Sequence, residues 1–246
     1  MFKRSKGMTQ MSENAWLWVG FIGMAIGSVV ILAQMGRKTA AEESHGVIHS
    51  IIPMIAAGLY LVMALNQGSV TIDNGREFLY ARYIDWSITT PLLLTGLALT
   101  ALDDLRKRLG LFIGLIGADI YMILAGLMAG YSPTSSADKW IWFLVSCGAF
   151  LAVYWVIWGP LRAEAERAGN GITYKRNAAI LSFLWLLYPV VFIFGTDGLL
   201  IITPALSALC FTVLDLVSKV GYGILCTAET NAKFAREGSA QRLPQA

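Results

Sequence analysis

The chain has 246 residues, of which 56% are hydrophobic and only 14% charged, and its mean hydropathy is +0.60. This composition is too apolar for a soluble globular domain of this length and indicates a protein of the lipid bilayer. The net charge of +3 is expected from basic cytoplasmic loops and gives no reason to expect a nucleic-acid partner.

Seven apolar runs follow one another along the chain, each near the roughly 20 residues that a membrane-spanning helix needs. They cover residues 15–35, 46–68, 79–102, 110–130, 140–160, 177–196 and 199–226. Because they are long and continuous, they predict helices and not barrel strands of alternating polarity. We therefore expect an all-α membrane protein with a seven-transmembrane-helix bundle at residues 15–226, an N-terminal segment at 1–14 and a C-terminal tail at 227–246.

The basic residues predict how this bundle is oriented. Twelve Lys and Arg residues fall in loops on the side of the C-terminus, against five on the side of the N-terminus, which are Lys3, Arg4, Lys6, Arg76 and Lys139. Loops rich in Lys and Arg stay in the cytoplasm. We expect the N-terminus to be extracellular and the C-terminus cytoplasmic, in a multi-pass protein of the cell (inner) membrane.

The cysteines do not indicate a metal site. Cys147, Cys210 and Cys226 lie in apolar or juxtamembrane sequence, are odd in number and lack metal-ligand spacing. We interpret them as packing residues and expect no metal.

A few ionisable side chains lie inside the predicted spans, and each is a candidate functional residue because burying a charge in lipid is costly. They are Arg82, Asp85, Asp119, Asp215 and Lys219, with His45 and His49 near the start of the second span. Lys219 lies near the middle of its run, too far from either end to reach water comfortably. Asp215 precedes it by four residues, which places both on one helix face.

Two interpretations of the pair Asp215 and Lys219 are open at this point. The first is a buried ion pair that fixes helix packing. The second is chemical, because an amine kept from water stays nucleophilic and can form a Schiff base with an aldehyde. A protonated Schiff base is a buried cation that needs buried anions, and Asp85 and Asp215 could supply them.

Three runs of residues resemble the helices of one family. Residues 82–94 read RYIDWSITTPLLL, residues 185–189 read WLLYP and residues 214–223 read LDLVSKVGYG. They resemble the third, sixth and seventh helices of microbial rhodopsins, and the resemblance extends through all seven spans. An Arg, an Asp, a Thr and a Pro at this spacing in one helix rarely coincide with Asp-x-x-x-Lys in another, so the motifs are specific.

The resemblance implies that all-trans retinal is bound covalently to Lys219 as a protonated Schiff base, with Asp85 and Asp215 as its counter-ion pair. Asp85 would be the primary proton acceptor, Thr89 would hydrogen-bond Asp85, and Arg82 would hold a charge near the extracellular half-channel. The residues that resemble the retinal pocket are Tyr60, Trp86, Thr90, Leu93, Met122, Gly126, Ser146, Trp185, Tyr188, Pro189 and Phe192. Most of these positions are equally explained as apolar core.

The cytoplasmic half departs from the usual pattern. Many relatives place a carboxylic proton donor eleven residues after the acceptor, where this chain has Gly96. The set Asp85, Thr89 and Gly96 resembles a subgroup of outward proton pumps that lack this donor. At about 1.5 Å per residue, His49 and Gly96 both lie roughly 16 Å toward the cytoplasm, if Tyr60 is level with Lys219. His49 could therefore relay protons, or it could cap a buried polar network; His45, one turn nearer the loop, is expected to be solvated.

The extracellular half also departs from the family. Asp197 lies where relatives often have one acid of a proton-release pair, and the second position holds Ser207. We expect late release of the proton, or release from a different group.

The expected function is a light-driven outward proton pump that lacks the usual carboxylic donor, an energy converter and not an enzyme. The alternative is a sensory rhodopsin that signals light to a transducer protein, which the missing donor favours. Chloride or sodium pumping is less expected, because Asp85, Thr89 and Gly96 do not match those relatives. A transporter or receptor without a chromophore would leave Lys219 and Asp215 as a structural pair. Besides protons and lipid, the expected partner is a further copy of the chain, in a trimer or pentamer.

Overall fold

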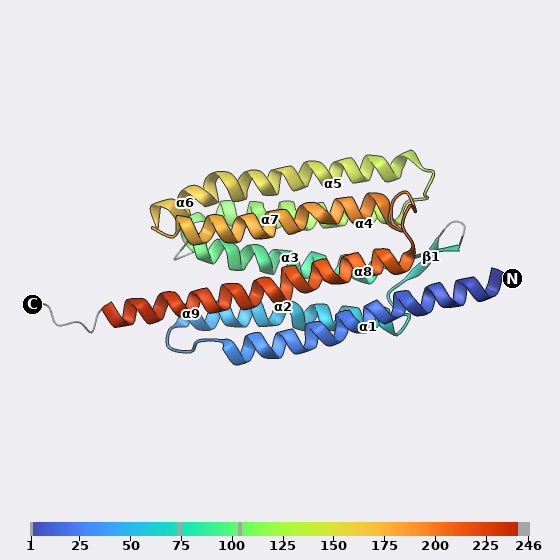
Figure 1. The fold of residues 1–246 in the computed structure, drawn as a ribbon. Helices are drawn as coiled ribbons and strands as arrows, with labels where there is room; N and C mark the ends of the chain where they lie inside the picture. Colours follow the sequence, from blue (N-terminus) through green and yellow to red (C-terminus); the bar gives the residue numbers. More distant parts are fainter. Residues whose placement is uncertain (1, 73–74, 103–104, 241–246) are drawn as a thin grey trace, which may run out of the picture.

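The protein is a bundle of long helices whose axes lie side by side (Figure 1). The computed structural model describes residues 2–72, 75–102 and 105–240, and within these ranges it describes side chains from residue 13 to residue 236. Over these ranges, seven helices are long and apolar enough to cross a membrane, which confirms the predicted fold class. The start of the first helix and the end of the last lie at opposite ends of the bundle (Figure 1).

The spans follow one another in the expected order. The first three are α1 (Phe2–Gln34), α2 (Ala40–Ala64) and α3 (Tyr80–Ala101), with an antiparallel hairpin of β1 (Val70–Ile72) and β2 (Arg76–Phe78) between α2 and α3. The fourth joins the short helix η2 (Leu105–Arg108) to α4 (Leu109–Tyr131), and the fifth joins α5 (Ala137–Val156), the π-helical η3 (Ile157–Leu161) and α6 (Arg162–Arg167). The sixth is α7 (Gly171–Phe194), and the seventh runs through α8 (Pro204–Asp215), the π-helical η4 (Leu216–Gly221) and α9 (Tyr222–Ala240).

The second span begins at Ala40, earlier than the predicted residue 46, because its start is capped. The Thr39 hydroxyl accepts a hydrogen bond from the Glu42 N–H, and the Glu42 carboxylate accepts one from the Thr39 N–H. This reciprocal pair satisfies two N–H groups that a helix start leaves without partners. Hydropathy alone does not detect such a start.

The sixth and seventh spans also differ from their apolar runs. The sixth begins at Gly171 and not at residue 177, since its polar first turns are helical. The seventh begins at Pro204 and not at 199, because the Thr203 hydroxyl caps it and proline suits the first helical position. The apolar residues before it form a loop in which Leu200 has a φ of 58°. Within the described residues, helix also covers most of the predicted end segments 1–14 and 227–246, whose sides of the membrane stay predictions.

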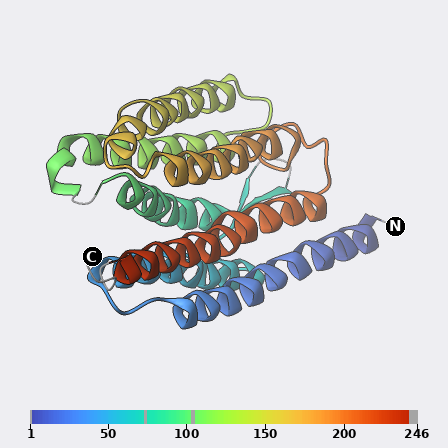
Figure 2. The ribbon, with the colours of Figure 1, turned by 60° about the vertical axis from the view of Figure 1, so that its left-hand side comes forward.

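The outer surface of the bundle is apolar and the centre holds the polar residues. Leu151 is 70% exposed and Trp155 69%, as expected for side chains that face lipid. The second, third and seventh spans are the most buried. Two views show α8 and α9 running beside α1 and α2 (Figures 1 and 2). The ionisable residues of the third and seventh spans are therefore held where the helices meet.

Candidate functional site

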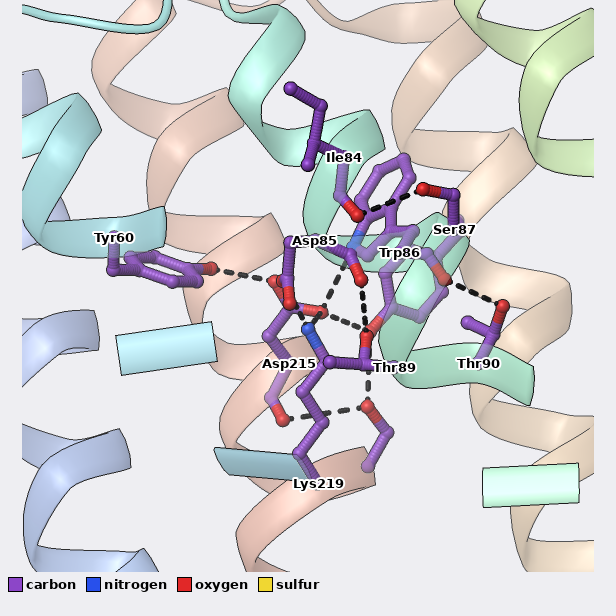
Figure 3. Close-up of polar contacts among 11 residues, drawn as sticks. Tyr60, Ile84, Asp85, Trp86, Ser87, Thr89, Thr90, Asp215 and Lys219 are labelled. Atoms are coloured by element: carbon purple, nitrogen blue, oxygen red, sulfur yellow. Dashed lines mark hydrogen bonds and ion pairs between the residues drawn. The ribbon is translucent and has the colours of Figure 1, made fainter. Parts of the chain in front are cut away.

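Lys219 lies between two aspartates at the centre of the bundle (Figure 3). Its side chain is 1% exposed, and its Nζ forms ion pairs with Asp85 Oδ2 on α3 and, at 3.2 Å, with Asp215 Oδ1 at the end of α8. Lys219 itself lies in the π-helical turn η4. Such turns widen a helix locally and are frequent at functional sites. The structure thus brings together the three charges that the sequence singled out.

Asp215 is saturated with hydrogen-bond donors from three helices. Tyr60 of α2 donates to its Oδ2 at 2.7 Å, and Tyr188 of α7 and Trp86 of α3 donate to its Oδ1 at 2.8 and 3.2 Å. With Lys219 at 3.2 Å, both carboxylate oxygens are engaged. This carboxylate is therefore fixed in place by the surrounding side chains.

Asp85 has a different environment. It is 0% exposed, and its Oδ2 pairs with Lys219, but its Oδ1 has no hydrogen-bond partner among the described residues. The Thr89 hydroxyl donates to the main-chain oxygen of Asp85, at 2.8 Å. Of the two carboxylates beside Lys219, only that of Asp85 has an oxygen without a donor, and this oxygen can take up a proton.

Arg82 and Asp119 flank this centre without joining it. The Arg82 guanidinium lies 4.4 Å from the centre of the Phe211 ring, a cation–π geometry, and its Nε has no partner. Asp119 Oδ2 lies 2.7 Å from the Thr90 hydroxyl, which links α4 to α3.

A cavity extends from Lys219 between α3, α4, α5 and α7, and its walls are mostly aromatic or apolar. Ten of the eleven predicted pocket residues line it, namely Trp86, Thr90, Leu93, Met122, Gly126, Ser146, Trp185, Tyr188, Pro189 and Phe192. Tyr60 does not line it, because its ring lies against α1 at Gly20 and its hydroxyl reaches Asp215 from the other side. The lining residues that sequence reasoning missed as pocket residues are Tyr83, Ile123, Phe143, Cys147, Phe150 and Ser218. Phe143, Cys147 and Phe150 recur at helical spacing, which could have identified this face of α5.

The residues that line this cavity fit the retinal that the resemblance implies. One primary amine opens into it, the anionic groups Asp85 and Asp215 lie at that amine, and the remaining walls offer apolar and aromatic surface. Across the described residues, no group of three or more His, Cys, Asp or Glu side chains is arranged to hold a metal ion.

The surroundings of Gly96, where the sequence predicts a missing proton donor, have a clear geometry. A Cβ atom built on Gly96 would lie 2.8 Å from His49 Nε2 and 2.9 Å from its Cε1, so the imidazole occupies the space beside this glycine. Gly223 of α9 packs against the His49 main chain from the other side. Both ring nitrogens of His49 are buried without a hydrogen-bond partner. The expectation that His45 is solvated is wrong, since it is 8% exposed and its ring stacks on that of His49 with centres 6.2 Å apart.

At the opposite end, Asp197 belongs to a buried polar cluster that ties loops together. Its Oδ2 accepts from the Tyr83 hydroxyl at 2.8 Å, its Oδ1 lies 3.8 Å from Arg76, and its main-chain oxygen accepts from Lys139 Nζ at 2.5 Å. Ser207 is buried with a partnerless hydroxyl. Lys139 is buried and the Arg76 side chain is only 7% exposed, although both lie in the predicted loops. Both donate to main-chain oxygens.

This cluster leads to a stability prediction for Lys139. Replacing it with methionine keeps much of the side-chain length but leaves the Ala129 and Asp197 oxygens without their donor. We expect a loss of about 2 kcal/mol, the usual cost of losing hydrogen bonds from a buried charged group. The shift in thermal unfolding in detergent measures it, with Lys139→Arg as a control that keeps the charge. An unshifted melting temperature for Lys139→Met would contradict a structural role.

Comparison with known proteins gives a consistent result. A family model described as bacteriorhodopsin-like protein matches residues 11–232. The chain is 36% identical over 223 residues to the bacteriorhodopsin-II-like protein of Haloquadratum walsbyi, covering 87% of this chain and 89% of that protein. It is 36% identical over 220 residues to the bacteriorhodopsin of Haloterrigena sp., covering 87% and 86%.

Solved structures agree with these relatives. The thermophilic rhodopsin from Rubrobacter xylanophilus superposes with a TM-score of 0.83 at 38% identity, covering 89% of this chain and 99% of that one. A rhodopsin of Coccomyxa subellipsoidea, described as a light-driven proton pump, superposes with a TM-score of 0.80 at 30% identity, covering 88% and 96%.

Proposed function

Because the chain belongs to the bacteriorhodopsin-like family of microbial rhodopsins, we propose that it is a light-driven pump that moves protons outward across the cell membrane. The family consists of photoreceptors and transporters that carry retinal in a seven-helix membrane bundle, and not of enzymes. The relative described as a light-driven proton pump supports pumping over sensing. We further propose that the end of the bundle where α1 begins is extracellular, in keeping with the loop charges.

We propose that Lys219 holds the chromophore and that Asp85 accepts the proton. Bound retinal supplies a Schiff base with Lys219 Nζ and an isomerisation driven by light. Lys219 Nζ holds the proton in the dark, and the observation that carries the proposal is its direct contact with Asp85, whose second oxygen is open. Asp215 keeps its bonds to Tyr60, Tyr188 and Trp86 and stays as the fixed counter-ion. The proton therefore moves from Nζ to Asp85, toward the proposed outside.

On the extracellular side we propose that the release path avoids Asp197. Its carboxylate is engaged by Tyr83 and Arg76, so it is better suited to holding the loops than to giving up a proton early. We propose that the path passes Arg82 and the Ser207 hydroxyl instead. Arg82 forms no ion pair among the described side chains, and its Nε and the Ser207 hydroxyl are buried without a hydrogen-bond partner. Late release of the proton is the expected consequence.

A direct experiment tests the proposed function. Cells that make the protein with all-trans retinal are expected to acidify their medium on illumination, and a protonophore should abolish the signal. A coloured protein that undergoes a light-driven cycle without acidification would favour the alternative, a sensor with a transducer partner.

We propose that His49 returns the proton to Lys219 in place of the missing donor. Its imidazole lies beside Gly96, where relatives carry the acid, and its two ring nitrogens can accept a proton on one side and donate one on the other. Replacing His49 with alanine should slow proton return to Lys219 by about 100-fold, a typical contribution of a positioned acid–base group. Time-resolved visible absorption measures this rate.

The matched control is Ser50→Ala, the buried neighbour whose hydroxyl bonds to the Val47 main chain. It removes a polar group from the same helix turn and should leave proton return unchanged. An unchanged rate in His49→Ala would instead show that His49 only completes a buried polar network.

A further inference from the structure

A line of functional side chains on the seventh span leads from Lys219 toward the proposed cytoplasmic end. Tyr222, Cys226 and Glu229 are spaced by four and three residues in α9, which places them along one helix face, and Tyr222 follows Lys219 by three residues. At about 1.5 Å per residue, the line is roughly 15 Å long. Lys219, Tyr222 and Cys226 are buried, and the Glu229 side chain is 18% exposed. The line thus joins the reactive amine to the surface.

Contacts from α2 and α7 make this line continuous. Asn177 of α7 donates to Glu229 Oε2 at 3.1 Å, and its amide lies 3.7 Å from Cys226 Sγ. Further in, the Tyr222 ring meets the His49 ring edge to face, with centres 5.9 Å apart. The chain of contacts therefore ends at the imidazole beside Gly96.

Several buried polar atoms around this line have no hydrogen-bond partner among the described residues. They are the Tyr222 hydroxyl, both ring nitrogens of His49, His45 Nδ1 and the Thr227 hydroxyl. Leaving a buried polar group unpaired costs about 1–3 kcal/mol, and ordered water commonly satisfies such groups. Buried atoms without partners also occur elsewhere in the bundle, at Arg76, Arg82 and Ser207. Water that satisfies the atoms around this line would form a hydrated seam beside Asn177 and Tyr222.

A second acid near this end, Glu42, is buried and already engaged. Glu42 Oε2 accepts from the main-chain N–H groups of Lys38 and Thr39 at 2.9 Å, as part of the cap of α2. Glu229 instead pairs with the half-exposed Arg176, whose guanidinium can turn to solvent. Of these two acids, Glu229 is the one whose carboxylate can exchange protons with water.

We propose that Glu229 is the cytoplasmic entrance for protons, and that they pass along a water-filled seam beside Asn177 and Tyr222 to His49. This proposal rests on the proposed function, because it supplies the proton that His49 passes to Lys219. Glu229 takes up a proton from the cytoplasm, gives it to the water of the seam and is ionised again.

The kinetic test replaces Glu229 with glutamine. Proton return to Lys219 should slow by about tenfold, less than for a group next to the amine, because water can partly replace an entrance carboxylate. Glu164→Gln is the matched control, since Glu164 is also 18% exposed and paired with arginines, but lies off the line. A rate within twofold of the parent in Glu229→Gln, or an equal slowing in Glu164→Gln, would overturn the proposal.

A second measurement needs neither light nor chromophore. The parent protein is treated with methyl methanethiosulfonate, a small water-soluble thiol reagent, and the modification of Cys226 is followed by peptide mass spectrometry. A thiol sealed in a dry core reacts only through rare opening, at about 10⁻³ or less of the denatured rate. We expect Cys226 to react well above that limit, and more slowly in Asn177→Phe, which fills the seam.

If Cys226 is modified at or below that rate, or if Asn177→Phe leaves its modification rate unchanged, the proposed water-filled seam does not exist. Because this labelling works on colourless protein, it separates the two proposals. If the parent protein forms no coloured pigment or does not acidify the medium, the proposed function is wrong. The labelling of Cys226 still tests whether water reaches this part of the bundle.

Discussion

Replacing Lys219 with alanine is expected to leave a protein that stays colourless with all-trans retinal and moves no protons in light. Lys219 is the amine that lines the cavity of the described structure, and its Nζ is the atom that contacts both aspartates. Lys139, which is also buried, is held by main-chain oxygens near the opposite end of the bundle and cannot replace it. Visible absorption after reconstitution measures the loss.

The adjacent residue provides the control. Ser218 also lines the cavity, and its hydroxyl lies 3.0 Å from that of Tyr188. Ser218→Ala keeps the amine and both aspartates, so it should still form a pigment, with a shifted absorption maximum because a dipole beside the amine is lost. If Lys219→Ala bound retinal and cycled like the parent, the proposed site would be wrong.

Replacing Asp85 with asparagine should preserve the pigment but reduce light-driven proton movement at least about 100-fold, since the proposed proton acceptor, which contacts Lys219 directly, is removed. The change removes the acceptor oxygen while keeping the size of the side chain. Asp215, whose oxygens are already engaged by Tyr60, Tyr188 and Trp86, offers no open position for the proton. A pH electrode under illumination, with parent and variant side by side, measures the loss.

Asp119→Asn is the matched control for this experiment. Asp119 is equally buried on the neighbouring α4, but it contacts Thr90 and not Lys219. We expect this variant to pump, with lower stability from the weakened link between α3 and α4. Pumping by Asp85→Asn at the parental rate would show that another group accepts the proton.

Much of the architecture follows from the sequence alone. A helix in lipid must satisfy its own backbone and present apolar side chains, so seven long apolar runs are enough to predict seven spans. The separation of Asp215 and Lys219 by four residues predicts that they share a helix face, because this depends only on helix geometry. The family resemblance follows equally from the residues, and the comparisons confirm it. The helix starts could not be read from the apolar runs, because the residues that cap them, Thr39 and Thr203, are polar.

The tertiary structure decided what depends on how the helices are rotated and packed against one another. Sequence spacing says nothing of which side chain of one helix reaches another, so it could not show that Asp215 is saturated while Asp85 keeps an open oxygen. The same holds for the π-helical turn at Lys219, which shifts the register of one helix relative to its neighbours. Packing also buried Lys139 and His45, which the sequence analysis assigned to loop and solvent, because partners distant in the chain surround them.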